Sequence, residues 1–177
     1  GGASGVGSGM RLNTAELLEA RNTLMRSNAQ PVKAAGDKWV CILHPDSQRD
    51  LFSDPSYIAA LQYAGPRDGT NPLFSGEMFD YLGIRFFVTS NARVFTTAGL
   101  SLSEVYATML IGNEAYGVSE LDAQNGRIFY KGVGSAGHVD PIDQLWSVGY
   151  KVAHAAARLN ETFMVRIEHS ASAGYYS

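Results

Sequence analysis

The spacing of apolar residues changes along this chain, and this change limits the fold class more than any other feature. Up to Tyr63, most apolar residues recur at the three- and four-residue spacing of amphipathic helices, interrupted by one apolar run of strand length. From Gly76 onward they recur at every second residue, which is typical of strands. No segment of the sequence repeats at a fixed period. The chain is therefore predicted to be α+β: a helix, a strand, short helices, and then mostly strands.

Three helices are predicted in the first part of the chain. Asn13 to Ser27 has the pattern of a helix, because Asn13 is a suitable N-cap and Glu16 stands three residues later, as in a capping box. Residues 46–52 have the pattern of a short helical turn. A second short helix is expected to begin at Asp54-Pro55 and to run through Tyr63, because Pro is favoured at the first helical position.

The strands follow from apolar runs and from alternation. Trp39 to Leu43 is apolar throughout and ends before Pro45, which predicts a central strand with both faces covered. Residues 77–89 are predicted to form a hairpin that turns near Gly83. Two further strands are predicted over Val105–Ile111 and Arg127–Lys131.

The last part of the chain alternates strongly. Residues 146–152 and 163–168 are predicted to form two long strands joined near Asn160-Glu161. A helix over Ala153–Ala157 remains an alternative for the stretch between them.

Composition excludes several classes of protein. The 14 basic and 17 acidic residues give a net charge of −3, which argues against nucleic acid as the main partner. The single cysteine, Cys41, excludes a disulfide framework within one chain. No apolar run approaches the ~20 residues that span a membrane, so no membrane partner is expected. The first residues, GGASGVGSG, have the composition of a flexible segment unless another part of the protein holds them, and a Gly-Gly start fits a processed or trimmed piece.

A glycine pattern at Gly132-x-Gly134-x-x-Gly137 matches the fingerprint of dinucleotide-binding domains. That fingerprint needs a helix directly after it, and here Asp140-Pro141 follows instead. We therefore interpret it as a glycine-rich turn, in which Gly134 or Gly137 is expected to have a positive φ.

His44, Asp46 and Ser47 could suggest a hydrolase triad, but such triads are assembled from distant segments and need an oxyanion hole. We expect His44 to cap a strand end or hydrogen-bond a loop, and Ser47 to be a capping or turn residue.

The four histidines have no metal-binding spacing: they are His44, His138, His154 and His169. His138 with Asp140 supplies two ligands, too few for a closed site. Asp140 and Asp143 are interpreted as turn and capping residues, and Cys41 as an inert core residue. The sequence thus predicts no catalytic, cofactor-binding or metal-binding residue.

A series of short blocks resembles the major capsid proteins of tailed phages, in the order found in that family. They cover about residues 13–172. The blocks are Gly36–Pro45 with Arg49-Asp50-Leu51, Asn71–Glu77, Gly83–Phe86, Ala115–Val118, Gly134–Gly137 through Asp140-Pro141, Val148–Lys151, Arg158–Glu161 and Met164–His169.

The resemblance implies the capsid-shell fold shared by tailed phages and herpesviruses, an α+β fold with a spine helix and with peripheral and axial domains. It implies a flexible segment at 1–12, the spine helix and connector at 13–36, the axial domain at 37–143, and C-terminal strands and tail at 144–177. The arm and the extended loop of the family are not evident in the sequence. The chain resembles the C-terminal part of a member, since members are typically far longer.

The function implied is that of a self-assembling, non-enzymatic subunit of the icosahedral head shell around packaged viral DNA. Expected partners are further copies in hexamers and pentamers, then portal and decoration proteins, with DNA close by but bound non-specifically. The expected location is the virion, after assembly in the bacterial cytoplasm. The alternative is a small α+β hydrolase or nucleotide-binding domain that uses His44 or the Gly132–Gly137 turn.

Overall fold

The chain forms two compact units in the computed structural model, one comprising Gly1–Ala115 with Asn160–Ser177 and the other Tyr116–Leu159. The structure describes residues 5–7, 9–63, 80–96, 98–99, 104–119, 126–135, 142 and 144–172. Within these residues, no helix combines the length and the apolar character that a membrane crossing requires.

The helices of the first unit lie where the sequence predicts them. Helix α1 (Thr14–Arg26) is capped by Asn13, whose Oδ1 accepts a hydrogen bond from the backbone N–H of Glu16 at 2.9 Å. Helix α2 (Pro45–Phe52) follows directly on the first strand, and helix α3 (Pro55–Tyr63) begins after Asp54. Asp54 caps α3 by accepting from the N–H of Ser56 at 2.9 Å. A short 3₁₀ turn, η2 (Lys33–Ala35), precedes the first strand.

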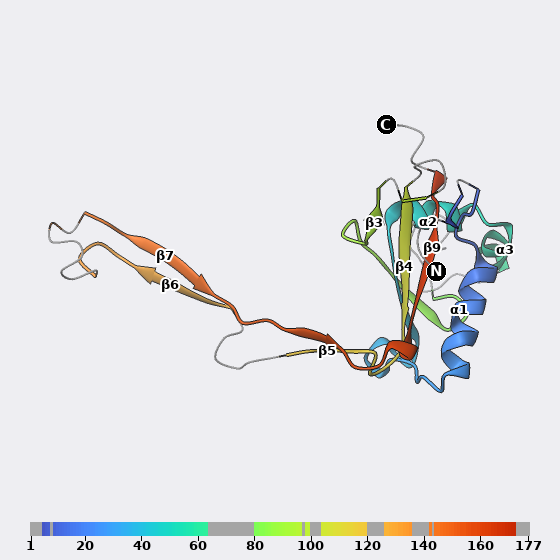
Figure 1. Ribbon diagram of the computed structural model, residues 1–177, viewed down its shortest axis with the longest axis horizontal. Helices are drawn as coiled ribbons and strands as arrows, with labels where there is room; N and C mark the ends of the chain where they lie inside the picture. The colour runs from blue at the N-terminus through green and yellow to red at the C-terminus, as the bar shows by residue number, and fades with distance from the viewer. Residues whose placement is uncertain are drawn as a thin grey trace. The chain divides into compact units, whose positions relative to one another are not determined.

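A mixed five-stranded sheet forms the centre of the first unit. Its strands are β1 (Trp39–Leu43), β2 (Ile84–Val88), β3 (Val94–Phe95), β4 (Val105–Ile111) and β9 (Met164–His169). Strand β9 pairs antiparallel along β4, and the two run side by side in Figure 1. Tyr106 of β4 pairs with Val94 of β3 on one side and with His169 of β9 on the other, so β3 and β9 lie on opposite edges of β4. Strand β1 pairs with the other end of β4, on the same edge as β3. The sheet therefore joins segments far apart in the sequence, and β1 is central, as predicted.

The predicted hairpin near Gly83 is only partly confirmed. Leu82 and Gly83 have φ values of 54° and 71°, and the backbone of Tyr81 and Ile84 exchanges two hydrogen bonds across them, which makes a tight turn. Residues 77–79 lie outside the described residues. Strand β2 instead pairs parallel with β1, in the register Trp39↔Ile84. The crossover through α2 and α3 allows this parallel pairing.

One face of the sheet and the three helices enclose the core. Leu110 and its neighbour Cys41 on β1 are fully buried there, and Leu17 of α1 packs in the same cluster. Figure 1 shows α1 running alongside the sheet. The N-terminal segment also lies against the chain: Val6 is buried, and Ser170 donates its N–H to the carbonyl of Met10 at 2.8 Å. Among the described residues of the glycine-rich start, the burial of Val6 agrees with the expectation that another segment holds it.

The second unit consists of two separate two-stranded ladders. Strand β5 (Tyr116–Val118) pairs with β8 (Ala156–Arg158), and β6 (Arg127–Lys131) pairs with β7 (Ser147–Lys151), both antiparallel. The two strands predicted over residues 146–152 and 163–168 are confirmed as β7 and β9. The prediction that they are joined near Asn160-Glu161 is wrong, because β7 pairs with β6 and β9 pairs with β4. A short 3₁₀ turn, η5 (Glu161–Phe163), precedes β9. The helical alternative for residues 153–157 is also wrong, since part of this stretch is strand β8.

Candidate subunit-contact surface

His44 has a structural position at the start of α2. Its Nδ1 accepts a hydrogen bond from the backbone N–H of Asp46 at 3.3 Å, which caps the helix. The same nitrogen lies 3.0 Å from Asp46 Oδ2. Tyr106 Oη lies 3.0 Å from Asp46 Oδ2 and 3.1 Å from Glu104 Oε2. Burial, followed by these two carboxylates, raises the pKa of Tyr106. The sequence predicts that His44 caps a strand end or hydrogen-bonds a loop, whereas in the structure it caps the start of helix α2.

Ser47 is buried in α2, and its Oγ has no hydrogen-bond partner among the described residues. The prediction of a capping role for Ser47 is wrong, because His44 caps this helix. A serine nucleophile needs a base within hydrogen-bond reach, and the histidines of the described residues do not supply one. His169 is buried, with Nε2 2.9 Å from Thr108 Oγ1 and Nδ1 2.9 Å from the carbonyl of Ser170.

The surroundings of His169 and Cys41 also indicate structural roles. Burial lowers the pKa of His169 more than the Ser170 carbonyl and Asp50 raise it. Nδ1 then donates to the carbonyl, and Nε2 accepts from Thr108. Cys41 is fully buried, and burial raises the pKa of its thiol, which agrees with the prediction of an inert core residue.

The glycine-rich turn lies between antiparallel strands rather than at a helix. Gly134 has a φ of 84°, as predicted for at least one of the two glycines, and the chain returns from β6 to β7 without the βαβ context of a dinucleotide site. Gly137, His138, Asp140 and Asp143 lie outside the described residues. His154 is exposed, and in the described part of the chain no three His, Cys, Asp or Glu side chains gather as metal ligands.

The most unusual surface of the molecule is the ladder of β6 and β7, which we call the ribbon. Figure 1 shows the two strands running side by side, and every residue of both strands is exposed. The register pairs Ile128 with Tyr150 and Tyr130 with Val148, and the Trp146 ring lies 6.4 Å from that of Tyr130. Because side chains alternate along a strand, these five residues share one face, which we call the apolar face.

The opposite side of the ribbon is basic, and we call it the cationic face. It carries Arg127, Lys131 and Lys151, and Arg127 stands directly opposite Lys151 in the ladder. Arg127 also lies over the ring of Phe129, with its guanidinium carbon 5.1 Å from the ring centre. Like charges directly opposite each other destabilise a ladder, and an isolated two-stranded ladder is at best marginally stable in water. The ribbon therefore has the properties of a segment that is completed by a partner.

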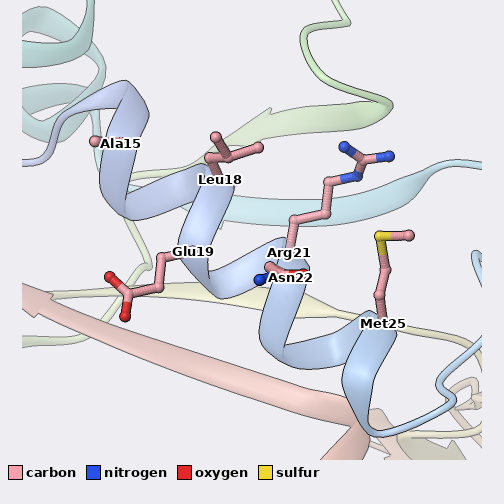
Figure 2. Close-up of a pocket in the computed structure, with 6 residues that line it drawn as sticks. All are labelled: Ala15, Leu18, Glu19, Arg21, Asn22 and Met25. Atoms are coloured by element: carbon pink, nitrogen blue, oxygen red, sulfur yellow. The ribbon is translucent and has the colours of Figure 1, made fainter.

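Helix α1 offers a second, smaller surface. Figure 2 shows six side chains that project from successive turns of α1 and line a shallow hollow of about 410 Å³, namely Ala15, Leu18, Glu19, Arg21, Asn22 and Met25. Leu18 and Met25 are about half exposed. This hollow combines the apolar side chains of Leu18 and Met25 with the polar side chains of Glu19, Arg21 and Asn22.

The pattern of a protein family, described as "Phage capsid protein", matches residues 2–120. The chain belongs to this family. The sequence blocks implied the same family. Among curated proteins, none matches the chain significantly. The ribbon lies beyond the matched residues.

Solved structures match almost the whole of this capsid protein. The capsid asymmetric unit of cyanophage Pam1 is 18% identical with a TM-score of 0.74, over 97% of this chain and 50% of that chain. The capsid of Ralstonia phage GP4 is 16% identical with a TM-score of 0.62, over 99% and 51%. The SrpI encapsulin complex of Synechococcus elongatus PCC 7942 is 8% identical with a TM-score of 0.60, over 99% and 55%.

These likenesses show that the fold is that of phage capsids, which agrees with the predicted α+β class. The chain spans about half the length of the structures it matches. The sequence patterns located β6 and β7 but did not indicate that one ladder would display an apolar and a cationic face. The signal was present in the alternation of Ile128 and Tyr130 with basic residues.

Proposed function

We propose that this protein is a major capsid protein, a self-assembling subunit of the icosahedral head shell that encloses packaged viral DNA. The observation that carries the proposal is the ribbon, whose strands are exposed along their whole length and carry large apolar side chains. A shell subunit needs extended contacts with its neighbours rather than a substrate pocket. Membership of the family and the capsid fold support the same function.

In this proposal the subunits form hexamers and pentamers, assembled in the bacterial cytoplasm and retained in the virion. Residues 13–36 supply the spine helix and connector, residues 37–143 the axial domain, and residues 144–177 the C-terminal strands and tail. Portal and decoration proteins would contact the finished shell. Packaged DNA lies close to it without being held tightly, because the chain has a net charge of −3.

The test is the assembly state of the full-length protein, measured by light scattering and negative-stain electron microscopy. We expect closed shells or rings of five and six subunits. A protein that stays monomeric at all concentrations, and whose melting temperature rises with a nucleotide or an ester substrate, would refute the proposal in favour of a small enzyme.

A further inference from the structure

The end of strand β9 joins parts of the first unit that are far apart in the sequence. Ser170 donates its backbone N–H, at 2.8 Å, and its hydroxyl, at 3.1 Å, to the carbonyl of Met10. Ser172 donates its backbone N–H, at 2.9 Å, and its hydroxyl to the carboxylate of Asp50 in α2. Residues 170–172, which we call the strap, therefore connect Met10 and α2 to the end of the central sheet.

His169 directly precedes the strap and is buried, with 1% of its surface exposed. Its Nδ1 lies 2.9 Å from the carbonyl of Ser170, and its Nε2 lies 2.9 Å from Thr108 Oγ1 on β4. The neutral imidazole satisfies both contacts when Nδ1–H donates to the carbonyl and Nε2 accepts from the hydroxyl. His169 thus fixes the carbonyl of the same residue whose N–H and hydroxyl hold Met10.

A protonated imidazole does not suit this site. It has two N–H donors and no acceptor, so Nε2 would donate to Thr108, and the hydroxyl of Thr108 would lose its acceptor. Thr108 is fully buried, and a buried hydroxyl without an acceptor costs free energy. The positive charge itself would also be enclosed. In agreement with this geometry, burial lowers the pKa of His169 more than the Ser170 carbonyl and Asp50 raise it.

The groups around His169 do not offset its burial. Asp50 of α2 favours the protonated form, but both of its carboxylate oxygens accept hydrogen bonds from Ser172. Tyr106 of β4 stacks its ring on the imidazole, with the ring centres 6.1 Å apart. Further charged or titratable groups on the surrounding elements are His44 and Asp46 at the start of α2, Glu104 before β4, Glu16 in the first turn of α1, Arg11 beside Ser170 in the backbone pairing, and Glu168. Burial remains the main influence on the charge of His169.

The N-terminal segment, described over residues 5–7 and 9–12, is the part of this junction that is most easily released. It is rich in glycine, and Met10 is 54% exposed. Ordering each residue costs roughly 1–2 kcal/mol of backbone entropy, which a glycine-rich stretch offsets weakly. His169 occupies the last pair of the ladder between β4 and β9, opposite Tyr106, so opening at this point leaves the rest of the ladder paired. Local opening therefore needs less free energy than unfolding of the first unit.

We propose that His169 is a proton-operated latch, which in its neutral form holds the strap and the N-terminal segment together and which releases both when it is protonated. The first unit then has two states in solution, docked and released. This inference goes beyond the proposed function and does not depend on it, because every contact involved lies within one chain.

The direction of the pH dependence follows from the charge that the docked state disfavours. The pKa of His169 lies below its ordinary value of 6.5 in the docked state and returns toward that value on release. The docked state is therefore fully stabilised above about pH 6.5, and this contribution is lost as the pH falls toward the docked value. Because one proton is taken up, the equilibrium constant for release rises by up to about tenfold for each pH unit in this window.

Hydrogen–deuterium exchange of the whole chain, measured by mass spectrometry, tests the latch. Exchange is compared at about pH 7.5 and about pH 5.5, on either side of the ordinary pKa of histidine, with labelling times scaled for the intrinsic effect of pH on amide exchange. We expect peptides that contain the N-terminal segment and the strap to lose protection together, several-fold, at the lower pH. Peptides from β1 and β4 should keep their protection.

A histidine substitution and its matched control isolate the titrating group. His169→Asn cannot take up a proton, and its amide N–H can still donate to the carbonyl of Ser170. We expect its N-terminal segment to have the same protection at both pH values. His154→Asn removes an exposed histidine of the second unit and should behave as the wild type. Nuclear magnetic resonance titration of the wild type gives a measurement that needs no variant: the His169 signal should titrate below pH 6.5, in parallel with the loss of protection.

Different outcomes would overturn the latch. Protection of the N-terminal segment that is equal at both pH values excludes it. Wild-type pH dependence in His169→Asn would assign the effect to another group, such as Glu16. Release of the strap without the N-terminal segment would show that the two are not coupled, and simultaneous loss of protection in β4 would indicate unfolding of the unit instead. Failure of the chain to form shells bears only on the proposed function.

Discussion

One carboxylate, that of Asp54, caps two helices at once, so its removal should cost more than the loss of an ordinary cap. Asp54 Oδ2 accepts from the N–H of Thr14 at 2.7 Å and from its Oγ1 at 2.8 Å, at the start of α1. Asp54 Oδ1 accepts from the N–H of Ser56 at 2.9 Å, at the start of α3. Thr14 is buried, so its N–H would lose its partner in a site that water reaches poorly.

We expect Asp54→Ala to lower the free energy of unfolding by about 2–3 kcal/mol, since each cap contributes about 1 kcal/mol and the hydrogen bonds are made to a charged group. The matched control is Asn13→Ala, which removes only the bond from Glu16 to Asn13 and should cost about 1 kcal/mol. The assay is urea unfolding of unassembled subunits, followed by far-ultraviolet circular dichroism. A loss in D54A no larger than that in N13A would refute the double-cap argument.

The same cap gives the stability a pH dependence. Burial raises the pKa of Asp54, but the hydrogen bonds from Thr14 and Ser56 outweigh it, so the pKa lies below its ordinary value of 3.8. A carboxyl whose pKa is lower in the folded state stabilises the fold above its ordinary pKa, and this contribution is lost as the pH falls through the folded-state value. The difference between wild type and Asp54→Asn should therefore be constant near neutral pH and should shrink below about pH 4. A difference that persists in strong acid would contradict this assignment.

Two further predictions concern packing. Gly112→Ala should lower the free energy of unfolding by about 1–3 kcal/mol, because a Cβ there would lie 3.0 Å from Trp39 Cζ3 and 3.2 Å from the carbonyl of Gln30. The control is Gly149→Ala in β7, where the space is open, and it should change stability by less than about 0.5 kcal/mol. Thermal unfolding of both variants measures the difference, and equal melting temperatures would contradict the prediction. Ser47→Ala should leave stability unchanged or raise it by up to about 1 kcal/mol, without affecting assembly. The reason is that the buried hydroxyl of Ser47 makes no hydrogen bond among the described residues. A marked loss of stability in the same thermal unfolding experiments would reveal a hydrogen bond at this position.

The elements that depend on nearby residues could be predicted from the sequence. Strands β1 and β4 have the predicted bounds, and α1 begins at the predicted cap. A cap or an apolar run acts over a few residues, so its signal is contained in a short stretch of sequence. The positions of two chemically reactive residues are local features of the same kind, since His44 stands at the start of a helix and Cys41 within an apolar strand.

Strand pairing could not be predicted in this way. Strand β2 pairs with β1 across two helices, and β9 reaches β4 from the far end of the chain. Such partners are selected by the packing of side chains distant in sequence, which local alternation does not encode. The hairpin predicted near Gly83 shows the difference: the tight turn is a local feature and is present, but the main partner of β2 is another strand.

By itself, the sequence determined the helix starts, the strand positions and the family of this capsid protein, because caps, periodicity and short motifs are properties of neighbouring residues. Only the tertiary structure decided which alternating strands have a buried side. Apolar and polar residues alternate in β9, which pairs with β4 in the central sheet. They alternate just as clearly in β6 and β7, whose residues are exposed on both faces. Alternation specifies that one face is apolar. What covers that face depends on the elements available to pack on it, and for the ribbon the described chain supplies none.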